Sequence, residues 1–126
     1  EDISVRLIIQ SASSEGLGRI TFVLDELYAS KAQALGAKWK LAGLCGDAII
    51  ERDIAKISII GSRLASTPGL AARMFSVLAR HGVNIDCISS SEMKIACVIA
   101  SERLDEAVRA VHDEFFSETK DATTVA

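Results

Sequence analysis

The sequence predicts an α+β fold in which helices cover one face of an antiparallel sheet. Three observations predict it: short runs rich in β-branched residues, stretches whose apolar residues recur at helical spacing, and the order in which the two alternate. From residue 56 onward the order is strand, helix, strand, strand, helix. A chain of 126 residues has room for one small domain or two half-sized modules.

The first strand of this order is Lys56–Ile60, a short β-rich run that ends at a glycine. A helix is expected next, opening at Pro68 and closing on Arg80-His81-Gly82, where cations and a glycine are typical of a helix end. Its apolar residues form one stripe at helical spacing. The stripe comprises Ala71, Met74, Phe75, Leu78 and Ala79.

The start of this helix contains the only proline of the chain. Pro68 suits the first helical position, because its missing N–H would be unpaired there. We expect Thr67 or Ser66 to cap the first turn and Gly69 to have an ordinary helical φ. A helix start with uncovered amides can receive an anion or a carboxylate. The alternative is a plain helix start with no ligand.

Two more strands and a second helix complete the pattern. Val83–Ser89 and Lys94–Ala100 are the predicted strands, and Ser101 is expected to cap the helix that follows. The apolar face of that helix comprises Leu104, Ala107, Val108, Val111 and Phe115. Residues 118–126 have no apolar period, so we expect a mobile tail there.

The first 50 residues repeat part of this order. Arg19–Leu24 matches Lys94–Ile99, and the strand that begins near Ile3 matches the one that begins at Val83. A helix is predicted over Glu26–Leu35, closed by Gly36, with a strand over 47–52 after it. The first unit therefore reads β-β-α-β and lacks an opening strand and helix.

Composition excludes several classes of function. The net charge of −3 and the interspersed charges argue against a nucleic-acid partner. No apolar run approaches the roughly 18 residues of a membrane span, and no signal peptide is apparent. The three cysteines show no metal or redox spacing and predict reduced, buried thiols; no metal site is expected. No phosphate-binding loop or nucleophile motif occurs, so no catalytic residue is predicted.

Four stretches resemble the C-terminal regulatory region of aspartate kinases. They are AKISIIG (55–61), STPGLAARMF (66–75), VNI (83–85) and ISSSEMKI (88–95). VRLIIQS (5–11) is similar to the matching strand of that family's first regulatory module. The resemblance covers roughly Ile3 to Phe116. One departure is Ser90, where the family usually has threonine.

The resemblance implies tandem ACT domains, each a ferredoxin-like βαββαβ unit. Residues 1–52 would form a partial first module and residues 53–117 a complete second one. Such regions bind lysine, threonine or both and feedback-inhibit the ATP-dependent phosphorylation of aspartate. ATP and Mg²⁺ would belong to the kinase domain, which is the other partner expected besides a second copy in a homodimer. A cytoplasmic location is implied, or a plastid for a plant enzyme.

The effector-binding residues are also carried over from the resemblance. They are Ser66, Thr67, Pro68 and Gly69; Asn84, Ile85 and Asp86; Ser89, Ser90, Ser91 and Glu92; and, in the first unit, Gln10 and Ser11. Backbone amides after Thr67 would donate to the effector carboxylate, and serine hydroxyls would accept from its ammonium. Two alternatives stay open: the serine run is only a polar hairpin turn, or the chain is an assembly module without a working site.

Overall fold

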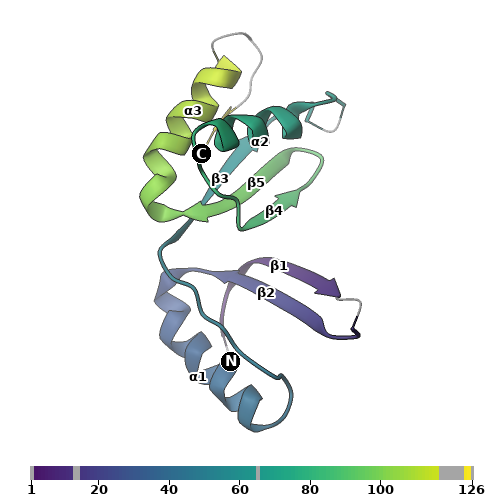
Figure 1. Ribbon diagram of the computed structural model, residues 1–126, viewed down its shortest axis with the longest axis vertical. Helices are drawn as coiled ribbons and strands as arrows, with labels where there is room; N and C mark the ends of the chain where they lie inside the picture. The colour runs from purple at the N-terminus through teal and green to yellow at the C-terminus, as the bar shows by residue number, and fades with distance from the viewer. Residues whose placement is uncertain (1, 13–14, 65, 117–123, 126) are drawn as a thin grey trace. The chain divides into compact units, whose positions relative to one another are not determined.

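The computed structural model describes residues 2–12, 15–64, 66–116 and 124–125. The chain divides into two compact units, Glu1–Arg52 and Asp53–Ala126 (Figure 1). Each unit has its own sheet. Within the described residues, no helix is long and apolar enough to cross a membrane.

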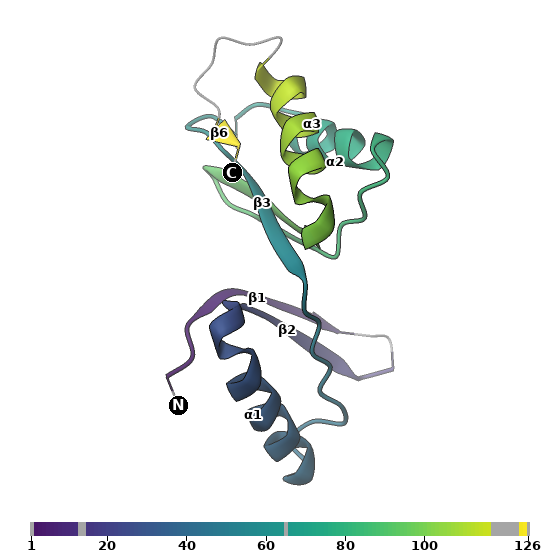
Figure 2. The ribbon, with the colours of Figure 1, turned by 90° about the vertical axis from the view of Figure 1, so that its left-hand side faces the viewer.

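The second unit has the element order strand, helix, strand, strand, helix, strand. Its elements are β3 (Ile54–Ile60), α2 (Leu70–Arg80), β4 (Cys87–Ser90), β5 (Lys94–Ala100), a 3₁₀ turn (Ser101–Arg103), α3 (Leu104–Phe116) and β6 (Thr124–Val125). The sheet order is β4-β5-β3-β6, with every pair antiparallel. Both helices lie on one side of this sheet (Figure 2). The predicted α+β fold is confirmed.

The core of this unit lies between the sheet and the two helices. Ile57 pairs with Cys97 and Ile59 with Ile95 across β3 and β5, so their side chains point to the same face. The helices contribute the other half of the core. Its fully buried helical members include Met74, Val77, Leu78, Ala107 and Val111. Aliphatic burial of this kind is the main stabilising contribution of the unit.

Three details of the second unit, apart from the loop into α2, differ from the sequence prediction. The strand expected over 83–89 begins only at Cys87. Ser101 does not cap a helix, because a 3₁₀ turn starts there with Ala100 at its N-cap and no side-chain cap bond. Within the expected tail, Thr124–Val125 forms β6 on the free edge of β3, while residues 117–123 and 126 lie outside the described part. A strand of two residues is too short to show an alternation of apolar and polar residues in the sequence.

The first unit is a hairpin with one helix. Its elements are β1 (Val5–Ala12), β2 (Gly18–Leu24), a 3₁₀ turn (Glu26–Tyr28) and α1 (Ala29–Leu41). The two strands are antiparallel. Arg6 on β1 forms an ion pair with Asp25, just after β2, with 2.8 Å between Nη2 of Arg6 and Oδ2 of Asp25. Helix α1 lies along one face of the hairpin (Figure 2).

Two predictions for the first unit were wrong. The helix does not end at Gly36 but continues to Leu41, and Gly36 is buried within it. A Cβ at Gly36 would lie 2.9 Å from the Cβ of Ala48, so glycine here permits close packing of the following segment. No strand forms over residues 47–52. In the second unit the last strand, β6, pairs with the opening strand, β3. The described part of the first unit contains no corresponding opening strand with which residues 47–52 could pair.

Candidate functional site

The loop into α2 differs from the expected helix start. The helix begins at Leu70, so Pro68 is not its first residue, and Gly69 is the N-cap with φ +86° in the left-handed region. Neither expected cap forms, because this end has no side-chain cap bond. The Ser66 hydroxyl instead donates to the carbonyl oxygen of Arg63 at 3.2 Å. Glycine is required at position 69 because other residues pay a steric cost at this φ.

This loop nevertheless leaves the first turn of α2 open. Residues 66–69 are all exposed, and a Cβ built at Gly69 would meet nothing within 4 Å. The first N–H groups of a helix have no partner inside the helix and carry the positive end of its dipole. The entry to α2 can therefore accept a carboxylate without displacing a capping side chain.

The turn after β4 lies at the same end of the sheet as this loop. The Ser91 N–H donates to the carbonyl oxygen of Lys94 at 2.8 Å, which closes the β4–β5 turn. The N–H of Gly61, at the start of the loop into α2, donates to the carbonyl oxygen of Met93 in the same turn at 2.9 Å. Two segments of the predicted site, 66–69 and 91–92, thus extend from one edge of the unit.

The serines of this region do not form a single cluster. Ser89 lies opposite Ala96 and Ser90 opposite Ile95, so their side chains point to opposite faces of the sheet. Ser90 is on the helix side, since Ile95 belongs to the core. Only Ser91 is in the turn itself. The turn structure that was one alternative for the serine run is present, and it leaves the exposed Glu92 at its tip.

Asn84, Ile85 and Asp86 lie at the opposite end of the sheet. The Asp86 N–H donates to the carbonyl oxygen of Val98 at 2.8 Å, near the end of β5, whereas the turn is at the start of β5. The Asn84 side-chain amide donates to the Asp86 carboxylate at 2.9 Å. Ile85 packs against the core. One copy of this unit therefore does not bring Asn84 and Asp86 to the loop into α2.

Gln10 and Ser11 are on β1 of the first unit. Gln10 lies opposite Ile20 and Ser11 opposite Arg19, so the two side chains point to opposite faces of the hairpin. Both residues are exposed. They form a third separate group of the predicted effector residues.

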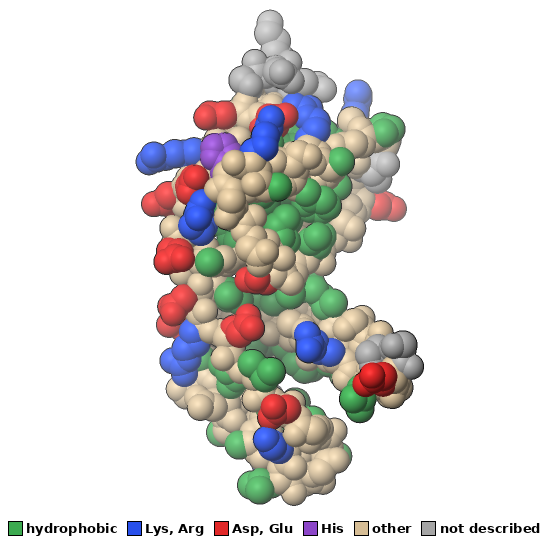
Figure 3. Space-filling model, in the orientation of Figure 1, with side chains coloured by type: hydrophobic (Ala, Val, Ile, Leu, Met, Phe, Trp, Pro, Cys, Tyr) green, Lys and Arg blue, Asp and Glu red, His purple; other side chains and the backbone are tan. Residues whose placement is uncertain are grey.

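A charged groove between α2 and α3 was not predicted from the sequence. It has a volume of about 830 Å³, and acidic and basic side chains gather on this side of the unit (Figure 3). The residues that line it are Val77, Arg80, His81, Glu102, Asp105, Glu106, Arg109, Ala110, Asp113 and Glu114. The charged residues that recur at helical spacing on the polar face of α3 are the feature of the sequence from which this groove could have been predicted.

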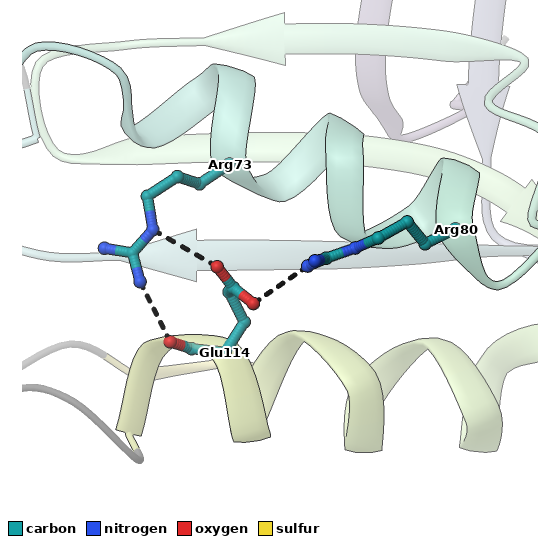
Figure 4. A network of polar contacts seen from close by, with 3 residues as sticks. All are labelled: Arg73, Arg80 and Glu114. Carbon is teal, nitrogen blue, oxygen red and sulfur yellow. Dashed lines mark hydrogen bonds and ion pairs between the residues drawn. The ribbon is translucent and has the colours of Figure 1, made fainter.

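Charged side chains form polar contacts in and beside this groove, and some of these contacts join α2 to α3. Glu114 accepts from Arg73 and from Arg80 (Figure 4). Glu106 lies 2.8 Å from an Arg103 nitrogen and 3.5 Å from Nδ1 of His81. These contacts give the groove a structural role in helix packing. Among the residues that the structure describes, no group of three His, Cys, Asp or Glu side chains is placed to hold a metal ion.

The cysteines differ in burial. Cys97 is fully buried in the core, and this burial raises the pKa of its thiol to about 11. Cys45 and Cys87 are only half-buried, so the expectation of three buried thiols was wrong for these two. All three are free thiols.

Comparisons with known proteins identify the class of module to which this fold belongs. A family model for the ACT domain matches residues 57–115, within the second unit. The regulatory subunit of aspartate kinase from Thermus thermophilus, solved in a ligand-free form, is 38% identical with a TM-score of 0.77. The match covers 90% of this chain and 74% of that subunit. The chain belongs to the aspartate kinase regulatory family.

Longer relatives show the same relationship. An aspartokinase of Thermus thermophilus is 40% identical over 116 residues. The structure of aspartate kinase from Synechocystis is 37% identical with a TM-score of 0.80 over 97% of this chain. The chain spans 28% of the length of the first of these and 22% of the second.

Proposed function

We propose that this chain is the amino-acid-binding regulatory region of an aspartate kinase. Lysine, threonine or both bind to it and inhibit the ATP-dependent phosphorylation of aspartate by an attached kinase domain. The observation that carries the proposal is the similarity, over both units, to a regulatory subunit of that enzyme. The chain contributes effector binding, while ATP and Mg²⁺ bind to the kinase domain.

The entry to α2 and the turn after β4 supply the chemistry for one end of an amino acid. The first-turn amides after Gly69 donate to the α-carboxylate, where the helix dipole adds to the attraction. The exposed Glu92 carboxylate and the Ser91 hydroxyl accept from an ammonium group. Such a site works by binding alone and needs no nucleophile.

The remaining effector residues come from another module. Because Asn84 and Asp86 lie at the far end of the sheet, they reach an effector at the loop only if they belong to a second ACT module. Gln10 and Ser11 are the corresponding polar residues of the first unit. We therefore propose that the effector binds at a module–module interface in a homodimer. We also propose that the protein is located in the cytoplasm, or in a plastid for a plant enzyme.

A second candidate is an assembly module without a working effector site. The free edge of β4 favours it: among the residues that the structure describes, this strand pairs only with β5, and it contains no proline that would block further pairing. The two candidates predict different responses. An effector-binding region gains thermal stability with lysine or threonine, whereas an assembly module responds only to protein concentration.

Calorimetric titration of the chain with lysine and with threonine tests the proposal. Saturable heat with either amino acid, together with a ligand-dependent rise in the unfolding temperature, is the expected result. A concentration-dependent unfolding temperature without any ligand response would favour the assembly module.

A further inference from the structure

Helix α1 of the first unit carries a small basic groove on its surface. The groove has a volume of about 220 Å³, and the residues that line it are Lys31, Ala34, Leu35 and Lys38. Lys31 and Lys38 are exposed, and within the described residues neither has an ion-pair partner. The third lysine of α1, Lys40, is instead paired with Asp47 at 2.9 Å. The groove therefore presents two cations that are free to bind carboxylates.

The internal repeat of the chain identifies the equivalent surface in the second unit. Helix α1 and the 3₁₀ turn before it correspond to α3 and its 3₁₀ turn, each displaced by 75 positions along the chain (29 to 104 and 26 to 101). Both helices have 13 residues. At the same displacement, the four residues of the α1 groove correspond to Glu106, Arg109, Ala110 and Asp113. All four of these line the groove between α2 and α3, so the α1 groove is equivalent to the surface on which a helix packs in the second unit.

The first unit lacks the buried side chains that a second helix would supply. In the second unit, α2 contributes three buried residues to the core. In the first unit, Leu7, Ile9 and Val23 share one face of the hairpin and are only half-buried. Among the described residues of this unit, Gly36 alone is buried. An apolar stripe at helical spacing, packed beside α1, would remove these half-buried side chains from water.

The charges of the two equivalent grooves are reversed. Two carboxylates of the α2–α3 groove, Glu106 and Asp113, correspond to Lys31 and Lys38 of α1. In the second unit, α2 presents arginines to a carboxylate of α3 (Figure 4). Because α2 contains no acidic residue, a helix of this kind would bring its cations against the two lysines. A helix that fits α1 must instead carry carboxylates.

The spacing of the lysines and the packing of the second unit give the register and direction of such a helix. Lys31 and Lys38 are seven residues apart, which is two helical turns or about 10.5 Å. In the second unit, Arg73 lies 3.4 Å from Glu114 near the end of α3, and His81, just after α2, lies 3.5 Å from Glu106 near its start. The two helices of that unit therefore run antiparallel.

We propose that the groove of α1 binds an amphipathic helix that runs antiparallel to α1 and presents two carboxylates, two turns apart, to Lys31 and Lys38. The reversed charge makes this surface selective, because it attracts an acidic helix and repels a basic one such as α2. The same repulsion disfavours α1 of a second copy. The proposal concerns helix packing and does not depend on effector binding.

Titration of the complete chain with two synthetic helices tests this surface. Both have the sequence of residues 68–82 and are held helical by a covalent bridge between positions 72 and 76, which are exposed and one turn apart on α2. One helix keeps the natural sequence, and the other carries Arg73→Glu and Arg80→Glu. Trp39, the only tryptophan of the chain, follows Lys38 on α1 and reports binding through its emission. The acidic helix is expected to bind at least about tenfold more tightly than the natural one.

Charge changes on α1 provide the matched variants. Lys38→Glu should weaken binding of the acidic helix about tenfold, whereas Lys40→Glu makes the same change outside the groove and should alter it less than about twofold. The double variant Lys31→Glu/Lys38→Glu should prefer the natural, basic helix.

Three results would overturn the proposal: equal binding of the two helices, no change in Trp39 emission with either, or equal weakening by Lys40→Glu and Lys38→Glu. A change in Trp39 emission with the concentration of the chain alone would assign the groove to a second copy and would overturn it as well.

Discussion

Arg73 on α2 and Glu114 on α3 are joined by two hydrogen bonds. Nη2 of Arg73 donates to the backbone carbonyl oxygen of Glu114 at 3.0 Å, and Nε donates to its carboxylate at 3.4 Å. The guanidinium carbon also lies 4.9 Å from the ring centroid of Phe115. Arg80 donates to the other Glu114 carboxylate oxygen at 2.9 Å (Figure 4). One carboxylate thus fixes the register of two helices.

Replacing Arg73 by lysine should therefore destabilise the chain. Lysine keeps the charge but loses the planar fork and the stacking on Phe115. We expect a loss of about 1 kcal/mol in the free energy of unfolding in urea, and a coupling of about 0.5–2 kcal/mol in an Arg73→Ala/Glu114→Ala double-mutant cycle. Arg80→Lys, at a more exposed position, should cost under about 0.5 kcal/mol. Strictly additive single substitutions would show that the pair contributes nothing.

Gly69→Ala should destabilise the second unit through backbone strain alone. The added Cβ meets no neighbour, but the φ of +86° costs a non-glycine residue about 1–2 kcal/mol. The control is Gly46→Ala, at a glycine that is equally open and has no positive φ. Thermal unfolding of both variants measures the difference. Equal stability of the two would mean that the loop relaxes to another conformation without cost.

Burial of Cys97 should make stability depend on pH in the alkaline range. The unfolded thiol ionises near its usual 9.0, while the folded thiol retains its proton up to about pH 11. The folded state holds the thiol proton more tightly than the unfolded state does. The contribution of the protonated thiol to the free energy of unfolding is therefore complete below pH 9 and is lost as pH rises towards 11. The limiting slope is about 1.4 kcal/mol per pH unit.

Urea unfolding of wild type and Cys97→Ala at several pH values isolates this contribution. The variant should be less stable at neutral pH, because a core side chain is truncated. Its stability should nevertheless fall less steeply between pH 9 and 10.5. Parallel pH profiles for the two proteins would exclude a role for the thiol.

Elements whose apolar residues recur at a clear helical or strand spacing were predictable from the sequence. Features that depend on contacts between residues far apart in the sequence were not. The strand Lys94–Ala100 has its predicted bounds, because an apolar β-rich run between polar residues defines both ends. Gly36 was misread as a helix end, since its reason for being glycine is Ala48, twelve positions further along the chain. Gly69 was misread as helical because glycine is compatible with both a helix and a left-handed turn.

For the candidate site, the resemblance identified segments but not their arrangement. The polar character of the turn at Ser91 and Glu92 was visible in the sequence. That Asn84 and Asp86 lie at the other end of the sheet follows from the direction of β4, which only the strand pairing reveals. This separation is the physical reason why we propose that an effector would be shared between two copies of the chain.

The most direct measurement is calorimetric titration of lysine and of threonine into wild type, Glu92→Gln and Glu102→Gln. We expect saturable binding of at least one amino acid to wild type, weakened about tenfold to a hundredfold by Glu92→Gln, because the amide still accepts a hydrogen bond but lacks the negative charge that pairs with the effector ammonium. Glu102→Gln makes the same chemical change beyond the opposite end of β5 and should bind like wild type. Absence of heat with both amino acids, from a folded dimeric chain, would contradict effector binding by this region.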